Sequence, residues 1–205
     1  DQLTALKHKI KAMFRQWGVV DVSTNSVYSV SGRVKFLKQV IHHPIYLQLK
    51  RLYDLMDTTA AMKQDAEKSM IALGRSYPEI KEFKKIPGVG PIGAITFDAF
   101  VQTPDRFSNK HKLWRYCKMG IIDRSSDGKP LAFKRLDRSG VGELKAVSYR
   151  AWFCAQKGNN EVRQFYRASL QRTHNKTHAR LNTQRKIIAG MCGVWKRGGE
   201  CSGGV

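Results

Sequence analysis

Apolar residues at the start of the chain recur at steps of three and four positions. This spacing is typical of a helix with one apolar face, and it predicts a helix over residues 3–17 that ends before Gly18. Residues 19–31 are polar and β-branched without a helical period, so we expect a loop there that serves as a linker. The apolar stripe consists of Leu3, Leu6, Ile10, Met13, Phe14 and Trp17.

A second apolar stripe starts after Pro44 and keeps the same spacing over about 30 residues. It predicts a long helix or coiled-coil arm that Gly74 and Pro78 bring to an end. The arm can pair with a second copy of the chain or lie on its own domain, because Thr59 and Lys63 weaken the stripe near its middle. We expect at least a homodimer through this arm. The stripe consists of Ile45, Leu49, Leu52, Met56, Thr59, Met62, Ala66, Met70 and Leu73.

The second half of the chain alternates short helical patterns with turn-rich connections. The stretch 122–136 is expected to be a loop or a weak hairpin. The predicted fold class is mainly α: a helical linker and coiled-coil arm over residues 1–78, a compact helical domain over 79–197, and a flexible tail over 198–205. The candidate helices of the compact domain cover residues 91–100, 110–119, 142–156, 161–172 and 179–197.

The chain carries 37 Lys and Arg residues against 16 Asp and Glu, a formal net charge of +21. Such an excess repels itself unless a polyanion neutralises it, so DNA or RNA is the expected partner. A ribosomal-type structural protein or a binder of membrane surfaces would show the same charge. No stretch approaches the roughly 18 apolar residues of a membrane span, and the start lacks the layout of a signal peptide. Because the chain opens at Asp1 in a helical pattern, we expect it to be part of a longer protein.

The cysteines are widely spaced and form no CxxC pair, so we interpret them as reduced thiols. His174 and His178 stand one helical turn apart and could share a metal with Cys192 or Cys201. Without a second ligand pair we interpret both histidines as solvated or facing phosphate, and we expect no metal site. The four cysteines are Cys117, Cys154, Cys192 and Cys201.

The clearest local motif is KIPGVGP over residues 85–91, between two expected helices. Gly88 and Gly90 permit a tight turn with exposed backbone N–H groups, and the helix that starts near Pro91 directs its positive end to the same place. A DNA phosphate can bind there without any contact to a base, as in a helix-hairpin-helix motif, with Lys85 beside it. A purely structural glycine-proline turn is the alternative.

A second motif, RSSDGK over residues 124–129, places Ser125 and Ser126 among basic side chains. A serine hydroxyl attacks a phosphate only when its proton is removed and the phosphate is neutralised, and Arg124 and Lys129 can do the second. Taken alone, a Ser-Ser-Asp-Gly segment is far more often a simple turn. More basic residues follow the motif: Lys134, Arg135 and Arg138.

Five landmarks follow one another in an order that resembles the C-terminal half of IS110/IS1111-family transposases. They are IPGVGP (86–91), DRFS (105–108), LWRYCKMG (113–120), SSDGK (125–129) and RLDRSGVGEL (135–144). The segment QRKII (184–188) also resembles the closing helix of that family. LKHKIK (6–11), with Trp17 and Gly18, resembles the link to the coiled-coil arm of the family.

The resemblance implies a site-specific DNA recombinase that moves an insertion sequence. A serine of the C-terminal domain then attacks a DNA phosphate and leaves a covalent phosphoseryl link. By position, Ser126 best matches this nucleophile, and Ser125 is the adjacent alternative. The residues expected to contact DNA are Lys85, Gly88, Gly90, Arg124, Lys129, Lys134, Arg135, Arg138, Arg185 and Lys186.

The resemblance also implies partners. Family members carry an N-terminal RuvC-like domain whose acidic residues hold divalent metal, so Mg²⁺ is implied, although no residue of this chain is identified as its ligand. Some members use a structured guide RNA. A cytoplasmic, nucleoid-associated location in a prokaryote is expected.

The chain departs from the family pattern at Asp127, where a glycine is common. The added negative charge opposes attack on a phosphate. A non-catalytic nucleic-acid-binding module, or an inactive transposase fragment without its metal-binding domain, is therefore the alternative function.

Overall fold

The computed structural model describes residues 2–22, 25–122, 125–126, 129–130, 135–137 and 139–200. Over these residues the fold is mainly α, as the sequence predicts, and its few strands are two residues long. The chain divides into two compact units, Asp1–Ser69 and Met70–Val205. The division falls inside a helix, nine residues before the boundary that the sequence suggests at residue 78.

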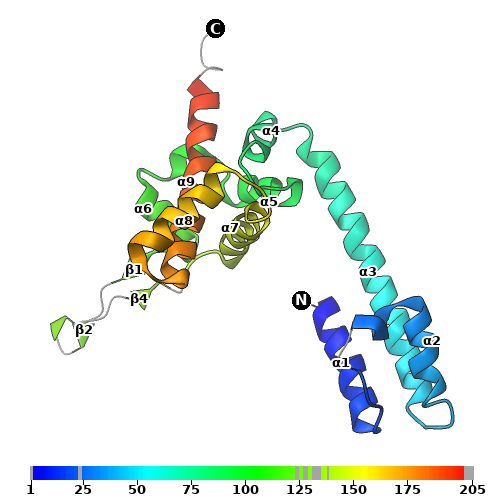
Figure 1. Cartoon of the computed structure of the whole chain (residues 1–205). Coiled ribbons are helices and arrows are strands. Elements are labelled where there is room, and N and C mark those ends of the chain that lie inside the picture. The colour runs from blue at the N-terminus through cyan, green and yellow to red at the C-terminus, as the bar shows by residue number, and fades with distance from the viewer. Residues whose placement is uncertain are drawn as a thin grey trace. The chain divides into compact units, whose positions relative to one another are not determined.

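The first unit contains four helical elements around one apolar core (Figure 1). The apolar face of α1 inserts Ile10 and Phe14, and the Phe14 ring lies 5.8 Å from the ring of Phe36 in α2. Tyr53 donates a hydrogen bond from its hydroxyl to the carbonyl oxygen of Val27 (2.9 Å) and joins α3 to the segment after α1. The elements are α1 (Gln2–Gln16), the 3₁₀ helix η1 (Asn25–Tyr28), α2 (Val30–Lys38) and the first part of α3 (Tyr46–Gly74).

The predicted linker over residues 19–31 instead contributes apolar residues to this core from its described parts, 19–22 and 25–31. Val22 and Val27 are buried, and the segment includes η1 and the first residues of α2. Ser29 caps α2 by accepting a hydrogen bond from the Gly32 amide (3.1 Å). The prediction was wrong because these apolar residues enter the core singly, without a helical period that periodicity analysis could detect.

The long arm predicted after Pro44 is confirmed as one continuous helix, α3, of 29 residues that ends at Gly74. Its first turns pack into the core of the first unit through Leu49, Tyr53 and Met56. Farther along, Met62 is 68% exposed and Leu73 is 71% exposed. The stripe is thus used within the unit only in its first half, and pairing of the arm with a second copy stays a prediction.

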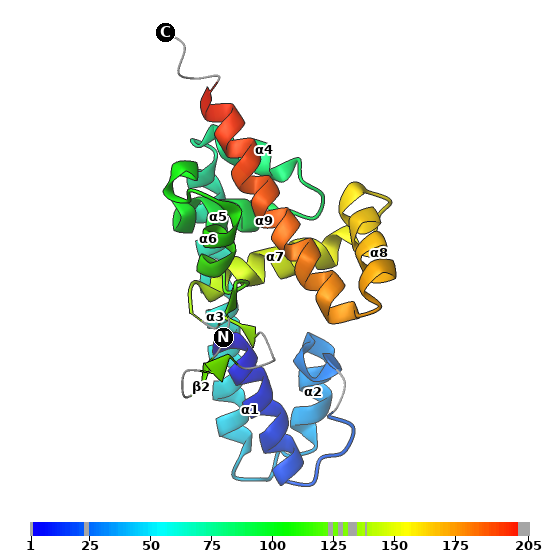
Figure 2. The same cartoon turned by 90° about the vertical axis from the view of Figure 1, so that its left-hand side faces the viewer.

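The second unit is a helical domain built around α9, which packs against α4, α6, α7 and α8 (Figure 2). Phe83, Phe97 and Trp195 form an aromatic cluster in its core, with ring centroids 5.2–6.2 Å apart. The helical elements are α4 (Pro78–Lys84), α5 (Pro91–Val101), η2 (Pro104–Arg106), α6 (Lys110–Tyr116), α7 (Gly142–Ala155), α8 (Glu161–Thr173) and α9 (Lys176–Glu200).

The five helices predicted for the compact domain are present, with ends shifted by up to three residues. Helix α4 is not among the helices predicted by residue range, because its seven residues are too few for a clear period. The predicted hairpin forms as two antiparallel ladders: β1 (Ile121–Ile122) with β4 (Arg135–Leu136), and β2 (Ser125–Ser126) with β3 (Lys129–Pro130). Helix α9 extends to Glu200, into the segment predicted as a flexible tail.

Candidate functional site

The hairpin carries both serine candidates at its outer ladder. Ser125 pairs with Pro130 and Ser126 pairs with Lys129, so the backbone positions of Ser126 and Lys129 face each other across the two strands. The inner ladder of β1 and β4 joins this outer ladder to the body of the domain. Three of the predicted DNA contacts, Arg124, Lys134 and Arg138, lie outside the described residues.

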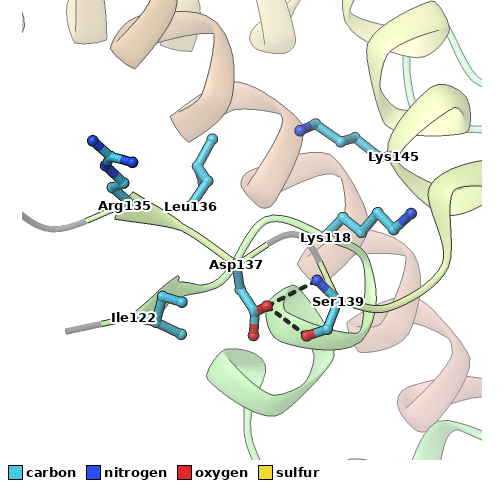
Figure 3. Close-up of a pocket in the computed structure, with 7 residues that line it drawn as sticks. All are labelled: Lys118, Ile122, Arg135, Leu136, Asp137, Ser139 and Lys145. Atoms are coloured by element: carbon cyan, nitrogen blue, oxygen red, sulfur yellow. Dashed lines mark hydrogen bonds between the residues drawn. The ribbon is translucent and has the colours of Figure 1, made fainter. Parts of the chain in front are cut away.

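Asp137 lies at the base of the hairpin and is 6% exposed. Its Oδ1 accepts hydrogen bonds from the Ser139 amide (2.8 Å) and the Ser139 hydroxyl (2.5 Å), as Figure 3 shows. Its Oδ2 accepts one from Arg115 Nε (2.8 Å), and its own amide donates to the Gly120 carbonyl oxygen (2.9 Å). The bonds from Ser139, followed by that from Arg115, hold the pKa of the Asp137 carboxyl below its usual range. Asp137 is therefore ionised and fixed in place at neutral pH.

The segment after β4 is fastened to the end of α6. The Val141 amide donates to the Tyr116 carbonyl oxygen (2.7 Å). Gly140 has a φ of +102°, and a Cβ atom there would lie 2.3 Å from the same carbonyl oxygen, so only glycine permits this close approach. Lys118 adopts a left-handed conformation with a φ of +54° as the chain leaves α6. The hairpin therefore starts and ends on a fixed support.

A cleft of about 810 Å³ opens beside this base. The cleft is lined by the cations Lys118, Arg135 and Lys145, and no carboxylate among the described residues forms an ion pair with them. The carboxylate of Asp137 also lines the cleft, but it is bonded to Arg115. Figure 3 shows Lys145 directed from α7 toward the strand that carries Arg135. A cleft with unpaired cations attracts phosphate. Its lining residues are Lys118, Ile122, Arg135, Leu136, Asp137, Ser139 and Lys145.

Sequence reasoning identified Arg135 but missed Lys118 and Lys145. Lys118 follows α6 and Lys145 lies in the first turn of α7, and no local motif connects the two lysines. Likewise, no feature of the sequence indicates that Arg115 and Asp137 form a pair. Their pairing depends on the tertiary contact between α6 and β4.

The predicted glycine turn lies between α4 and α5. Gly88 has a φ of +87°, and a Cβ atom there would lie 2.0 Å from the Ala151 carbonyl oxygen of α7. Gly90 precedes α5, is exposed, and has open space where a Cβ atom would be. Lys85 is exposed and its ammonium bonds to Glu82 (2.6 Å). The structure thus gives Gly88 a packing role and leaves Gly90 open to a ligand.

Residues 80–167 match the family model described as transposase IS116/IS110/IS902 family. The match starts in α4, ends in α8, and includes the glycine turn, the hairpin and α7. This segment is similar to the transposases of that family. The resemblance found in the sequence is thus confirmed for residues 80–167. None of the curated proteins matches the chain.

Two further predicted contacts lie on α9, which begins after the matched residues. Arg185 directs Nε and one terminal nitrogen to the Met119 carbonyl oxygen (2.9 and 2.5 Å) and lies over the Trp114 ring. Burial lowers the pKa of the Arg185 guanidinium. Lys186 is exposed, with its ammonium 4.2 Å from the centroid of the Phe165 ring. Arg185 therefore supports the segment after α6, whereas Lys186 is exposed and its contact with DNA stays a prediction.

No group of three His, Cys, Asp or Glu side chains that could hold a metal ion exists among the residues the structure describes. Cys117, Cys154 and Cys192 are free thiols, and burial raises the pKa of Cys117 to about 12. Within the same described part of the chain, no helix is long and apolar enough to cross a membrane.

Proposed function

We propose that this transposase cuts and rejoins DNA through Ser126, with Ser125 as the adjacent alternative. Ser126 Oγ loses its proton and forms a bond to phosphorus, and one deoxyribose oxygen leaves and takes up a proton as a free hydroxyl. The DNA end is then held as a phosphoserine ester. Attack by a hydroxyl of another DNA end reverses the step and releases the serine. No net oxidation and no hydrolysis are required.

The observation that carries this proposal is the position of Ser126 on a hairpin whose base adjoins a cationic cleft. Lys129 lies opposite Ser126 in the β2–β3 register and, with Arg124, is suited to neutralise the phosphate under attack. Lys118, Arg135 and Lys145 line the cleft and are suited to hold neighbouring phosphates. Gly90, at the start of α5, is suited to a separate backbone contact with a phosphate.

Ser139 also lies in the cleft, but its hydroxyl is committed to Asp137. The lowered pKa of the Asp137 carboxyl makes it a weak base, so this pair suits support of the hairpin better than attack on DNA. Asp137 is in this account a positioning residue, because it acts through the backbone it holds.

The other partners follow from the family resemblance. We expect a RuvC-like domain with bound Mg²⁺, a structured guide RNA and pairing through α3, in the cytoplasm of a prokaryote at the nucleoid. No step above is assigned to these partners.

The test incubates the full-length protein encoded by the gene with DNA from the ends of its element, the element's non-coding transcript and magnesium. A denaturing gel then detects covalent protein-DNA species. The proposal expects an adduct that Ser126→Ala abolishes, while Ser139→Ala and the surface control Ser76→Ala still form it. An adduct that survives Ser126→Ala and Ser125→Ala separately would refute the assignment. Tight, salt-sensitive binding without any adduct would favour the non-catalytic module.

A further inference from the structure

Helix α7 presents an unusual face to solvent. Lys145, Tyr149 and Phe153 follow one another at steps of four residues, so they lie along one side of the helix. Tyr149 is 43% exposed and Phe153 is 56% exposed. Two large exposed aromatic side chains next to cations indicate a binding surface rather than a solvated helix face.

A second cleft, of about 520 Å³, lies on this face. Arg180 of α9 reaches over it, with its guanidinium 5.6 Å from the Tyr149 ring centroid and 5.8 Å from that of Trp152. No ion pair with any described residue neutralises Lys145, Arg150 or Arg180. The cleft therefore combines three unpaired cations with an aromatic ring. Its lining residues are Gly142, Lys145, Ala146, Tyr149, Arg150, Arg180 and Gln184.

This second cleft connects the two DNA contacts that the sequence predicts. Lys145 lines both the cleft at the hairpin base and the cleft on α7. Arg150 lines the cleft on α7 and also a hollow of about 270 Å³ at the glycine turn, which includes Gly88 and Gly90. Each hollow thus shares a lining residue with the next, so the three hollows form a continuous series from the hairpin to the glycine turn.

We propose that a single polynucleotide strand lies along this face of α7, between the serine hairpin and the glycine turn. Its phosphates contact Lys145, Arg150 and Arg180, and its bases stack on Tyr149 and Phe153. A single strand fits better than a duplex, because duplex bases are stacked on each other and cannot reach aromatic side chains. The strand is identified as the one cut at the hairpin, and in that respect the inference rests on the proposed function. The binding itself does not depend on cutting.

The test measures fluorescence anisotropy of the full-length protein with a labelled single-stranded oligonucleotide, as DNA and as RNA, and with the matching duplex, over a range of salt concentrations. The triple variant Lys145→Ala, Arg150→Ala and Arg180→Ala should flatten the slope of log affinity against log salt by about 2, at roughly 0.7 per lost phosphate contact. The triple variant Lys81→Ala, Arg167→Ala and Arg172→Ala removes the same charge from exposed positions on α4 and α8 and should leave the slope nearly unchanged.

The aromatic contacts have a separate test. Tyr149→Ala should weaken single-strand binding on the order of 10- to 100-fold without a change in the salt slope, and Tyr149→Phe should restore it. Tyr77→Ala is the control, because Tyr77 is 50% exposed and precedes α4. Circular dichroism melting shows whether each variant is folded.

The inference is overturned if the two triple variants bind single strands alike, or if only duplex binding depends on the α7 face. The inference is supported if the α7 triple variant weakens binding of single-stranded DNA, whether or not it weakens binding of RNA equally. If it weakens binding of RNA alone, the bound strand is not the one cut at the hairpin. Adduct formation that survives loss of the α7 contacts would refute the assignment of this strand as the one cut at the hairpin and leave the serine mechanism intact. If the triple variant on α7 loses single-strand binding but the wild-type protein never forms an adduct, the serine mechanism is refuted and the α7 surface stands.

Discussion

Arg115 and Asp137 are joined by a hydrogen-bonded ion pair of 2.8 Å between Nε and Oδ2. The pair connects α6 to the residue that follows β4, and Asp137 in turn holds the Ser139 amide and hydroxyl. The buried carboxylate of Asp137 is consequently one of the supports at the base of the hairpin that carries Ser126. A loop that must place a nucleophile within bonding distance of phosphorus needs such support.

Substitution Asp137→Ala should slow adduct formation on the order of 10- to 100-fold while DNA affinity changes little, because reaction requires precise placement and binding relies on many distributed cations. Rates of adduct appearance and binding constants measured on the same preparation separate the two effects. Asp105→Ala is the control, since Asp105 is 86% exposed at its side chain and forms only a long ion pair of 3.8 Å with Lys196 Nζ among the described residues. An Asp137→Ala protein with a normal adduct rate would show that the carboxylate has no positioning role.

The two glycines of the turn should respond differently to alanine. Gly88→Ala should lower the free energy of unfolding by about 2 kcal/mol or more, because a left-handed φ and the Ala151 carbonyl oxygen both oppose a Cβ atom. Gly90→Ala should change the free energy of unfolding by less than about 1 kcal/mol, because a Cβ atom there would lie in open space. It should still weaken DNA binding, because that Cβ atom would occupy the space where a phosphate approaches the backbone. Urea unfolding and DNA titration measure the two quantities. Equal loss of stability in both variants would contradict the separate roles.

Substitutions of the neighbouring residues Arg185 and Lys186 should also have different effects. Arg185→Ala leaves the Met119 carbonyl oxygen without its donors, so it should destabilise the domain by roughly 1.5–3 kcal/mol. Lys186→Ala should leave stability within about 0.5 kcal/mol and reduce DNA affinity. Thermal unfolding followed by binding assays tests both. If Arg185→Ala keeps full stability and loses DNA binding, the sequence interpretation of Arg185 as a DNA contact is the better one.

Stability should also depend on pH through Asp98. Burial, followed by the charge of the nearby Glu79 carboxylate, raises the pKa of Asp98 to about 6. Between about pH 4, the unfolded value, and pH 6, the folded protein binds more protons than the unfolded chain, so this group makes stability fall as pH rises. Asp98→Asn should therefore be more stable than the wild type at pH 7.5, with a smaller difference at pH 5. Melting curves at both pH values check this, and a difference that grows at pH 5 would contradict it.

Much of the fold could be predicted because long apolar stripes determine helices. The stripe of α3 and the buried face of α9, with Ile187, Ile188 and Met191, were both visible as steps of three and four. Short or irregular elements were not predictable in this way. The residues of α4 are too few for a period, and Val22 and Val27 enter the core of the first unit singly.

The candidate site was predictable only where residues are close in sequence. The motif around Ser126 and the glycine turn are both local. The cleft cations Lys118 and Lys145, the support from Arg115 to Asp137 and the structural use of Arg185 all depend on contacts between distant elements. Local chemistry could therefore suggest a nucleophile, whereas its surroundings required the tertiary structure.

The most direct test of the central claim is to digest the covalent protein-DNA species with nuclease and protease and sequence the nucleotide-modified peptide by mass spectrometry. We expect a nucleotide phosphate attached to Ser126. Attachment at Ser125 would select the adjacent alternative. A modified residue outside the hairpin would contradict the proposed mechanism.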